Sequence, residues 1–251
     1  MKFNKPKTAK DRIILALDVD TLEEAEELVI ELKDYVGYFK VGLQLFTSCG
    51  FKPFEIIKKH GAKAFFDGKF HDIPNTVARA CVNLLNRGVD FFDVHTSGGS
   101  KMLSTTVKLT KEYAKKYKLA EPTIIGVTLL SSFGQKTLTT ELGVEKSLDK
   151  YVLNLAEVAK QVGLDGVMAS ASEAKEIRKH MGDDFIIICP AIRPTWSVVN
   201  DQVRVVTPTD AIKSGVDYMV IGRPITQAED KISAAKLIIA EIENSKISTN
   251  L

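Results

Sequence analysis

The feature that most constrains the fold of this chain is a regular alternation of two patterns. Short, almost continuous apolar runs are each followed by a longer segment in which apolar residues recur at helical spacing. Short runs of this composition are typical of parallel strands whose two faces are both covered by helices. We predict eight strands, at residues 14–18, 38–43, 65–69, 91–95, 123–130, 166–170, 185–191 and 218–222.

Helical segments are predicted between and after these strands. The first begins with a Thr21-x-x-Glu24 capping box and continues along one apolar face to Leu32. Pro74 suits the first turn of a later helix, and Thr207 is a suitable N-cap for another. The remaining helices are predicted at residues 43–60, from about 99, and at 148–162, 172–181, 209–214 and 228–243.

Eight strand–helix units in 251 residues predict the α/β class and a single (β/α)₈ TIM-barrel domain over residues 1–251. An open, doubly wound sheet is the alternative. It loses its main support because no Gly-x-Gly-x-x-Gly follows the first predicted strand. Residues 1–11 are predicted to be a polar extension, and residues from about 244 to 251 a frayed tail.

Charge and composition exclude several classes of protein. The chain has 34 Lys and Arg against 32 Asp and Glu, so its net charge of +2 gives no reason to expect a nucleic-acid partner. The polar start lacks an apolar signal-peptide core, and no apolar run approaches the roughly 20 residues of a membrane helix. The three cysteines lack metal-ligand spacing. We expect a cytoplasmic protein without a membrane partner.

Active sites of such barrels lie at the carboxyl ends of the strands, so the polar residues there are the candidates for chemistry. Of these, His95 is equally well explained as a structural group, and Ser131 as a donor to a substrate ring or as loop packing. The polar residues at predicted strand ends are Asp18, Lys40, Asp67, Lys69, Asp72, His95, Ser131, Ser170, Arg193 and Arg223.

The densest group of charges lies at the end of the third predicted strand. A period of two residues places Asp67 and Lys69 on one face of an extended strand, Asp72 follows within one loop, and Lys40 ends the neighbouring strand. Buried alternating charges are costly as scaffolding. An ammonium held between carboxylates can stabilise a developing carbanion and then protonate it. The alternative is a salt-bridge ladder on the surface.

A second group of polar residues follows the last two predicted strands. It consists of Arg193, Gln202, Gly222 and Arg223. Loops at these places commonly bind phosphate in barrels, where arginine supplies bidentate bonds and glycine lets the backbone approach the anion. Ordinary surface arginines and a glycine needed only for a turn are the alternative interpretation.

These motifs resemble those of the orotidine 5′-phosphate decarboxylase family along nearly the whole chain. The central match is the string DGKFHDIPNT at residues 67–76. The other matching segments are LALD at 15–18, FKVG at 39–42, VHTSGG at 94–99, residues 192–193, 201–202 and 207–208, and DYMVIGRP at 217–224.

The resemblance implies a cofactor-free conversion of orotidine 5′-monophosphate to uridine 5′-monophosphate and CO₂ in pyrimidine biosynthesis. It implies that Lys69 protonates C6 of the pyrimidine, that Asp67 lies beside the substrate carboxylate, and that Lys40 joins this charged array. Asp72, together with Thr76 at the ribose, is expected to reach into the active site of the partner in a homodimer.

The resemblance also implies how the nucleotide is held. Asp18 and Lys40 are expected to bind ribose hydroxyls, and Ser131 the pyrimidine. The phosphate is expected to contact Arg193, Gln202, Arg223 and the Gly222 amide.

Three positions depart from the family's usual pattern. Gly68 stands where a bulky apolar residue is general, which is expected to loosen the strand. Ala191 stands where glycine is common, and Ser131 where threonine is common. None of these changes removes a charged group of the expected site.

Two other functions remain as alternatives. One is a sugar-phosphate decarboxylase or synthase of the same superfamily, whose divalent metal is held partly by an acid at the end of the second strand. Here that position is Lys40, whose ammonium would repel a metal, so no metal site is expected. The other is a catalytically silent nucleotide-binding barrel, against which the retention of every expected charged residue counts.

Overall fold

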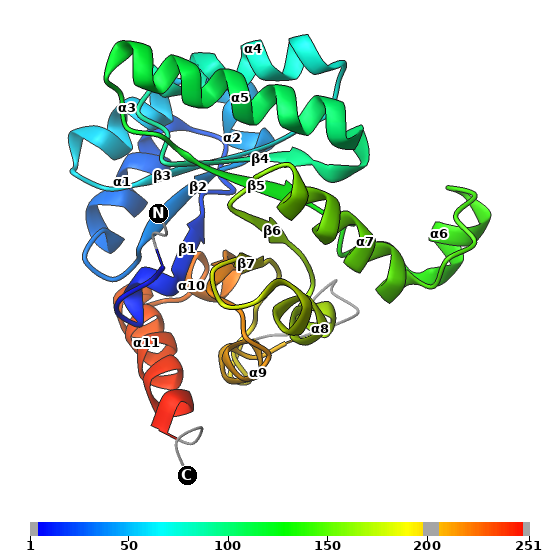
Figure 1. The fold of residues 1–251 in the computed structure, drawn as a ribbon. Coiled ribbons are helices and arrows are strands. Elements are labelled where there is room, and N and C mark those ends of the chain that lie inside the picture. Colours follow the sequence, from blue (N-terminus) through cyan, green and yellow to red (C-terminus); the bar gives the residue numbers. More distant parts are fainter. Residues whose placement is uncertain (1–4, 198–205, 248–251) are drawn as a thin grey trace.

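The computed structural model describes residues 5–197 and 206–247, and in it eight parallel strands close into a barrel in chain order (Figure 1). Strand β1 pairs with both β2 and β8, which completes the ring. The predicted (β/α)₈ barrel is therefore confirmed. The strands are β1 Ile13–Ala16, β2 Tyr38–Val41, β3 Ala64–Phe70, β4 Phe91–His95, β5 Thr123–Val127, β6 Gly166–Met168, β7 Ile186–Cys189 and β8 Tyr218–Ile221.

Helices surround the barrel on its outer face (Figure 1). Most lie where the spacing of apolar residues predicts them. They are α1 Leu22–Leu32, α2 Leu43–Cys49, α3 Lys52–Lys59, α4 Pro74–Leu85, α5 Gly99–Tyr117, α6 Gln135–Thr140, α7 Leu148–Gln161, α8 Ala171–Met181, α9 Pro208–Lys213, α10 Arg223–Thr226 and α11 Lys231–Ile247.

Four details of the helices differ from the prediction. The segment predicted as one helix over residues 43–60 is divided, because Gly50 has a left-handed φ of 61° that ends α2. The short helices α6 and α10 were not predicted. Helix α11 includes residues 244–247 of the predicted frayed tail. Residues 248–251 lie outside the described part, and the fraying itself stays a prediction.

The predicted helix starts are present. At α1, the Glu24 N–H donates to Thr21 Oγ1 at 3.2 Å, and the Thr21 N–H donates back to the Glu24 carboxylate at 3.2 Å. At α9, the Asp210 N–H donates to Thr207 Oγ1 at 3.1 Å. Each bond satisfies a backbone donor that the first helical turn leaves without a partner.

Side chains fill the barrel interior, and a second, larger apolar core lies between the strands and the helices. At the amino-terminal end of the barrel, the ring centroids of Tyr38 and Phe91 are 4.5 Å apart, and those of Phe91 and Tyr218 are 5.4 Å apart. All three side chains are almost fully buried. This end of the barrel is therefore packed, as is usual for barrels of eight strands.

Three aspartates join neighbouring strands at the same end; Asp217 is buried, and Asp90 and Asp165 are half-buried. Each directly precedes a strand and accepts the N–H of a residue at the start of the strand before it, which satisfies a backbone donor that would otherwise be buried alone. The pairs are Asp90 with Ala64 at 2.8 Å, Asp165 with Ile124 at 2.8 Å and Asp217 with Ile187 at 2.9 Å.

Among the described residues, no helix combines the length and the apolar character needed to cross a lipid bilayer.

Candidate active site

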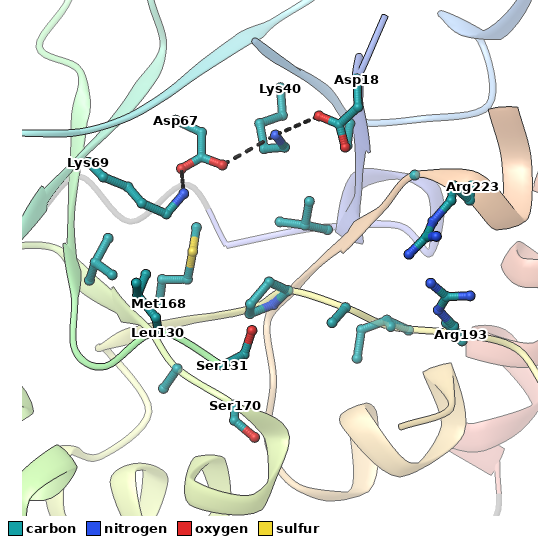
Figure 2. Close-up of a pocket in the computed structure, with 18 of the residues that line it drawn as sticks. Asp18, Lys40, Asp67, Lys69, Leu130, Ser131, Met168, Ser170, Arg193 and Arg223 are labelled. Carbon is teal, nitrogen blue, oxygen red and sulfur yellow. Dashed lines mark hydrogen bonds and ion pairs between the residues drawn. The ribbon is translucent and has the colours of Figure 1, made fainter. Parts of the chain in front are cut away.

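A cavity of about 270 Å³ opens at the carboxyl ends of the strands (Figure 2). Its walls combine charges of both signs with an apolar surface from β5, β6 and β8. The sequence-predicted residues that line it are Asp18, Lys40, Asp67, Lys69, Ser131, Ser170, Arg193, Gly222 and Arg223.

Lys40 lies between two carboxylates at one end of the cavity (Figure 2). Its Nζ atom is 3.2 Å from Asp18 Oδ1 and 3.2 Å from Asp67 Oδ2, and the residue is only 7% exposed. Burial alone would lower the pKa of Lys40, but the charges of Asp67 and Asp18 outweigh burial and raise it. Lys40 is therefore a fixed cation that binds the Asp67 carboxylate.

Asp67 forms a second ion pair through its other oxygen, Oδ1, with Lys69 Nζ (Figure 2). Burial would raise the pKa of Asp67, yet its value is lowered to about 2 by the charge of Lys40, a hydrogen bond with Asp93 and the contact with Lys69. Asp67 therefore stays ionised at neutral pH. One carboxylate thus holds two ammonium groups in the cavity.

A β-bulge at the end of β3 brings Asp67 and Lys69 together. Residues 67–69 stand opposite the single residue Asp93 of β4, and Lys69 has a left-handed φ of 47°. The predicted meeting of the two side chains is found, but the regular extended strand expected to produce it is wrong. The register that shows the bulge pairs Phe66 with Phe92 and then Phe70 with Val94.

Asp93 is a buried acid at this bulge that the sequence analysis missed. It is 0% exposed, and its Oδ1 atom accepts the Lys69 N–H at 2.8 Å. Its pKa is raised well above the usual range by burial and by the neighbouring Asp67 charge. An acid within the apolar strand FFDVH, in the same inward register as Phe91, was the available signal.

Two predicted site residues lie outside the cavity of their own chain. Asp72 and Thr76 are exposed at the start of α4, and Asp72 Oδ1 accepts the Ile73 N–H at 2.6 Å. The predicted alternating array therefore contains Lys40, Asp67 and Lys69 within one chain, without Asp72. Whether Asp72 and Thr76 act in a partner's site stays a prediction.

Two arginines form the other end of the cavity (Figure 2). Arg193 follows β7 and is only 4% exposed, and its backbone N–H donates to Val206 O at 2.9 Å. Arg223 is the first residue of α10, directly after Gly222. The two guanidinium groups point toward one another, as expected of a site for an anion. Gln202, also predicted here, lies outside the described residues.

Comparison with known proteins gives this arrangement a family. The model of the orotidine 5′-phosphate decarboxylase / HUMPS family matches residues 11–238. The chain belongs to this family. The match spans all eight strands and both ends of the cavity.

Individual members of the orotidine 5′-phosphate decarboxylase family are similar over almost the full chain. The orotidine 5′-phosphate decarboxylase of Syntrophomonas wolfei is 47% identical over 94% of this chain and 99% of its own. That of Moorella thermoacetica is 45% identical over 95% and 94%. The crystal structure of the enzyme from Lactobacillus acidophilus has a TM-score of 0.81 at 32% identity, covering 95% of this chain and 99% of that one.

Two departures from the usual pattern of the orotidine 5′-phosphate decarboxylase family have visible structural contexts. Ala191 has a left-handed φ of 63°, a conformation that favours glycine. At Gly68, a Cβ atom would lie 3.1 Å from the ring of Phe66 and 3.3 Å from that of Phe70. The two rings therefore occupy the space that a side chain at residue 68 would need. The expected loosening of the strand stays a prediction.

The histidines near the site do not line the cavity. The rings of His71 and His95 are 5.5 Å apart, and burial, His71 and Lys69 lower the pKa of His95. In the part of the chain that the structure describes, no three His, Cys, Asp or Glu residues are grouped so that they could hold a metal ion.

Proposed function

We propose that this protein decarboxylates orotidine 5′-monophosphate to uridine 5′-monophosphate and CO₂ in pyrimidine biosynthesis, without a cofactor or metal. The supporting observation is the polarity of one cavity. An ammonium–carboxylate–ammonium group stands at one end and a pair of arginines at the other. A nucleotide with a reacting base and a remote phosphate has the matching distribution of charge.

The phosphate would bind between Arg193 and Arg223, with the Gly222 amide beside it. Charge-assisted bonds from planar guanidinium groups suit a phosphate dianion. Because the phosphate does not react, its binding energy is available to position the base at the far end of the cavity. Ser131 lies along the cavity wall between the two ends, where its hydroxyl can meet the pyrimidine (Figure 2).

The reaction breaks the bond between C6 and its carboxylate. CO₂ leaves, and the bonding electron pair stays on C6. The Lys69 ammonium stabilises this pair and then donates its proton, which forms the C6–H bond of the product. Asp67 keeps Lys69 in place and stays charged, since its pKa is about 2. Lys40 neutralises Asp67 from the other side and can donate to ribose hydroxyls together with Asp18.

The active form would be a homodimer that shares residues between sites. Asp72 and Thr76 are exposed beyond the end of β3 and lie outside their own cavity, so a second copy is the expected place for them. Mixing inactive Asp72→Ala and Lys69→Ala subunits should restore activity, because some mixed dimers contain one site with both native residues. Lack of restored activity in demonstrably mixed dimers would contradict the sharing of sites.

The decisive experiment follows the absorbance of orotidine 5′-monophosphate with purified protein and excess chelator. We expect full turnover, because Lys40 occupies the place between Asp18 and Asp67 where a metal would need to bind. Loss of turnover on chelation, restored by a divalent metal, would instead support the sugar-phosphate enzymes of the same superfamily. Binding of uridine 5′-monophosphate without turnover would support a silent nucleotide-binding barrel.

A further inference from the structure

Asp93 of β4 is the single residue that stands opposite the bulge of β3. Oδ1 accepts the Lys69 N–H at 2.8 Å, which satisfies a backbone donor that the bulge removes from the regular ladder. A residue other than glycine is strained in the left-handed conformation, and Lys69 is such a residue. The Asp93 bond therefore stabilises the conformation that aims Lys69 into the cavity.

The second carboxyl oxygen of Asp93, Oδ2, is buried and lacks a hydrogen-bond donor among the described residues. The Asp67 carboxyl is the side-chain hydrogen-bonding neighbour of Asp93, and this interaction favours an ionised Asp67 and a protonated Asp93. Two ionised carboxylates cannot share such a contact in a buried site, whereas a proton on one of them forms a strong bond to the other.

The surrounding charges determine which carboxyl carries that proton. Asp67 contacts the ammonium groups of Lys40 and Lys69, both of which favour its ionised form. Asp93 is 0% exposed and accepts the backbone N–H of Lys69. The Lys69 ammonium also favours an ionised Asp93, but burial and the Asp67 charge outweigh it. A further titratable group that senses Asp93 is Cys81 of α4, a buried thiol whose pKa is raised by burial and by Asp93. The proton therefore belongs on Asp93.

We propose that Asp93 is a positioning residue of the decarboxylation site, acting as a neutral acid that donates to Asp67 and accepts from the Lys69 backbone. This proposal rests on the proposed function for its kinetic consequences. Asp93 does not line the cavity and has no contact with substrate in this role. It holds the bulge through the Lys69 backbone and holds the carboxylate that places the Lys69 ammonium.

The test compares two replacements of Asp93. Asparagine has nearly the same shape, with an oxygen to accept the Lys69 N–H and an NH₂ to donate to Asp67. We expect Asp93→Asn to keep kcat within about fivefold of the wild type, and Asp93→Ala to lower kcat about 100-fold, as small misplacements of reacting groups do. KM should change little in both, because the arginines at the other end of the cavity are untouched.

Asp90 offers a matched control, because its side chain also links β4 to β3. Its side chain accepts the Ala64 N–H at 2.8 Å, so it also joins the segment of β4 to β3, but at the amino-terminal end of the barrel. Asp90→Ala should lower the melting temperature and leave kcat unchanged. If Asp90→Ala lowers kcat as strongly as Asp93→Ala does, the effect of Asp93 is general destabilisation and the proposal is wrong.

The protonation of Asp93 has its own test, which does not depend on turnover. Urea unfolding of the wild type and of Asp93→Asn is compared between pH 5 and pH 7. A neutral Asp93 takes up one proton on folding, so Asp93→Asn should gain stability over the wild type as the pH rises. A constant difference would show that Asp93 is ionised in the folded protein and would overturn the proposal, even if Asp93→Ala does not fold.

The outcomes separate this proposal from the proposed function. Wild-type protein without decarboxylase activity but with the pH-dependent stability difference would contradict the function and keep the neutral acid at the bulge. Wild-type activity with equal kcat losses in Asp93→Asn and Asp93→Ala would keep the function and reject the positioning role.

Discussion

The two halves of the barrel line the cavity with different chemistry. On β2, β3 and β4, the inward residues Lys40, Asp67 and Asp93 are buried and carry ionisable side chains. On β5 to β8, inward residues at the corresponding level are apolar, and the cations of this half come after the strands. The apolar residues of this half that line the cavity include Val127, Met168 and Val220.

This difference matches the two tasks that the proposed function assigns to the cavity, reaction at one end and recognition of phosphate at the other. Groups that react must be held within a fraction of an ångström, and strands joined on both edges provide that rigidity. Recognition of a phosphate tolerates more variation, because several donors share the anion. Arg193 and Arg223 accordingly stand on segments after β7 and β8, whereas Lys40 and the Asp67–Lys69 pair stand on strands.

The largest predicted effect comes from removing Lys69, in the half of the barrel formed by β2, β3 and β4. In the proposed mechanism, Lys69→Ala lowers kcat at least about 10³-fold, since it removes the acid and the cation beside the developing charge. Binding of uridine 5′-monophosphate, measured by calorimetry, should persist because both arginines remain. Lys63→Ala is the control. Lys63 is exposed and directly precedes the first residue of β3, so its replacement should leave kcat unchanged. Wild-type turnover in Lys69→Ala would contradict the assignment.

In the half of the barrel formed by β5 to β8, the Arg223→Ala variant tests the proposed binding of phosphate. Loss of charge-assisted bonds to phosphate should weaken nucleotide binding by about 2 kcal/mol, roughly 30-fold, while the nucleoside without phosphate binds as before. Calorimetry with uridine 5′-monophosphate and uridine measures both. Arg87→Ala, which removes an arginine that pairs with Glu55 on the outer surface, is the matched control. Equal weakening of nucleotide and nucleoside would exclude a phosphate site at this end.

Asp67 of β3 and Asp93 of β4 should give the free energy of unfolding opposite dependences on pH. The pKa of Asp67 is lowered, so its contribution is present above its unfolded value near 3.8 and is lost as the pH falls toward about 2. The pKa of Asp93 is raised, so its contribution is present below 3.8 and is lost as the pH rises. Asp93→Asn should therefore gain on the wild type by up to about 1.4 kcal/mol per pH unit above pH 4, measured by urea unfolding.

Sequence patterns predicted the barrel and most of the cavity because parallel strands bring their carboxyl ends to one edge. Asp18, Lys40, Arg193 and Arg223 could be placed from strand ends alone. The bulge could not, since a period of two residues assumes a regular strand, and residues 67–69 do not follow it. Asp93 was missed for a related reason: its role comes from a pairing between strands that the bulge creates.

The smallest predicted effect is on stability and concerns backbone strain in the half of the barrel formed by β5 to β8. Ala191, directly after β7 and before the arginine-bearing segment, has a φ of 63°. Ala191→Gly should relieve left-handed strain, offset in part by the greater freedom of glycine in the unfolded chain, for a net gain of up to about 1 kcal/mol. Thermal unfolding measures this gain. A loss of stability would show that the methyl group contributes more by packing than the strain costs.

The rings of Tyr38, Phe91 and Tyr218 pack the amino-terminal end of the barrel interior, opposite the end at which the cavity opens. A packed interior of this kind is not a pore, so a ligand has no path through the barrel. In the proposed function, the nucleotide would enter and leave through the same mouth of the cavity, which Arg193 and Arg223 line. In the proposed reaction, retained uridine 5′-monophosphate therefore blocks the next substrate and acts as a competitive inhibitor. In the same reaction, the CO₂ released beside Lys69 would leave by the mouth through which the nucleotide entered. Release of both products is consequently tied to the opening of a single entrance.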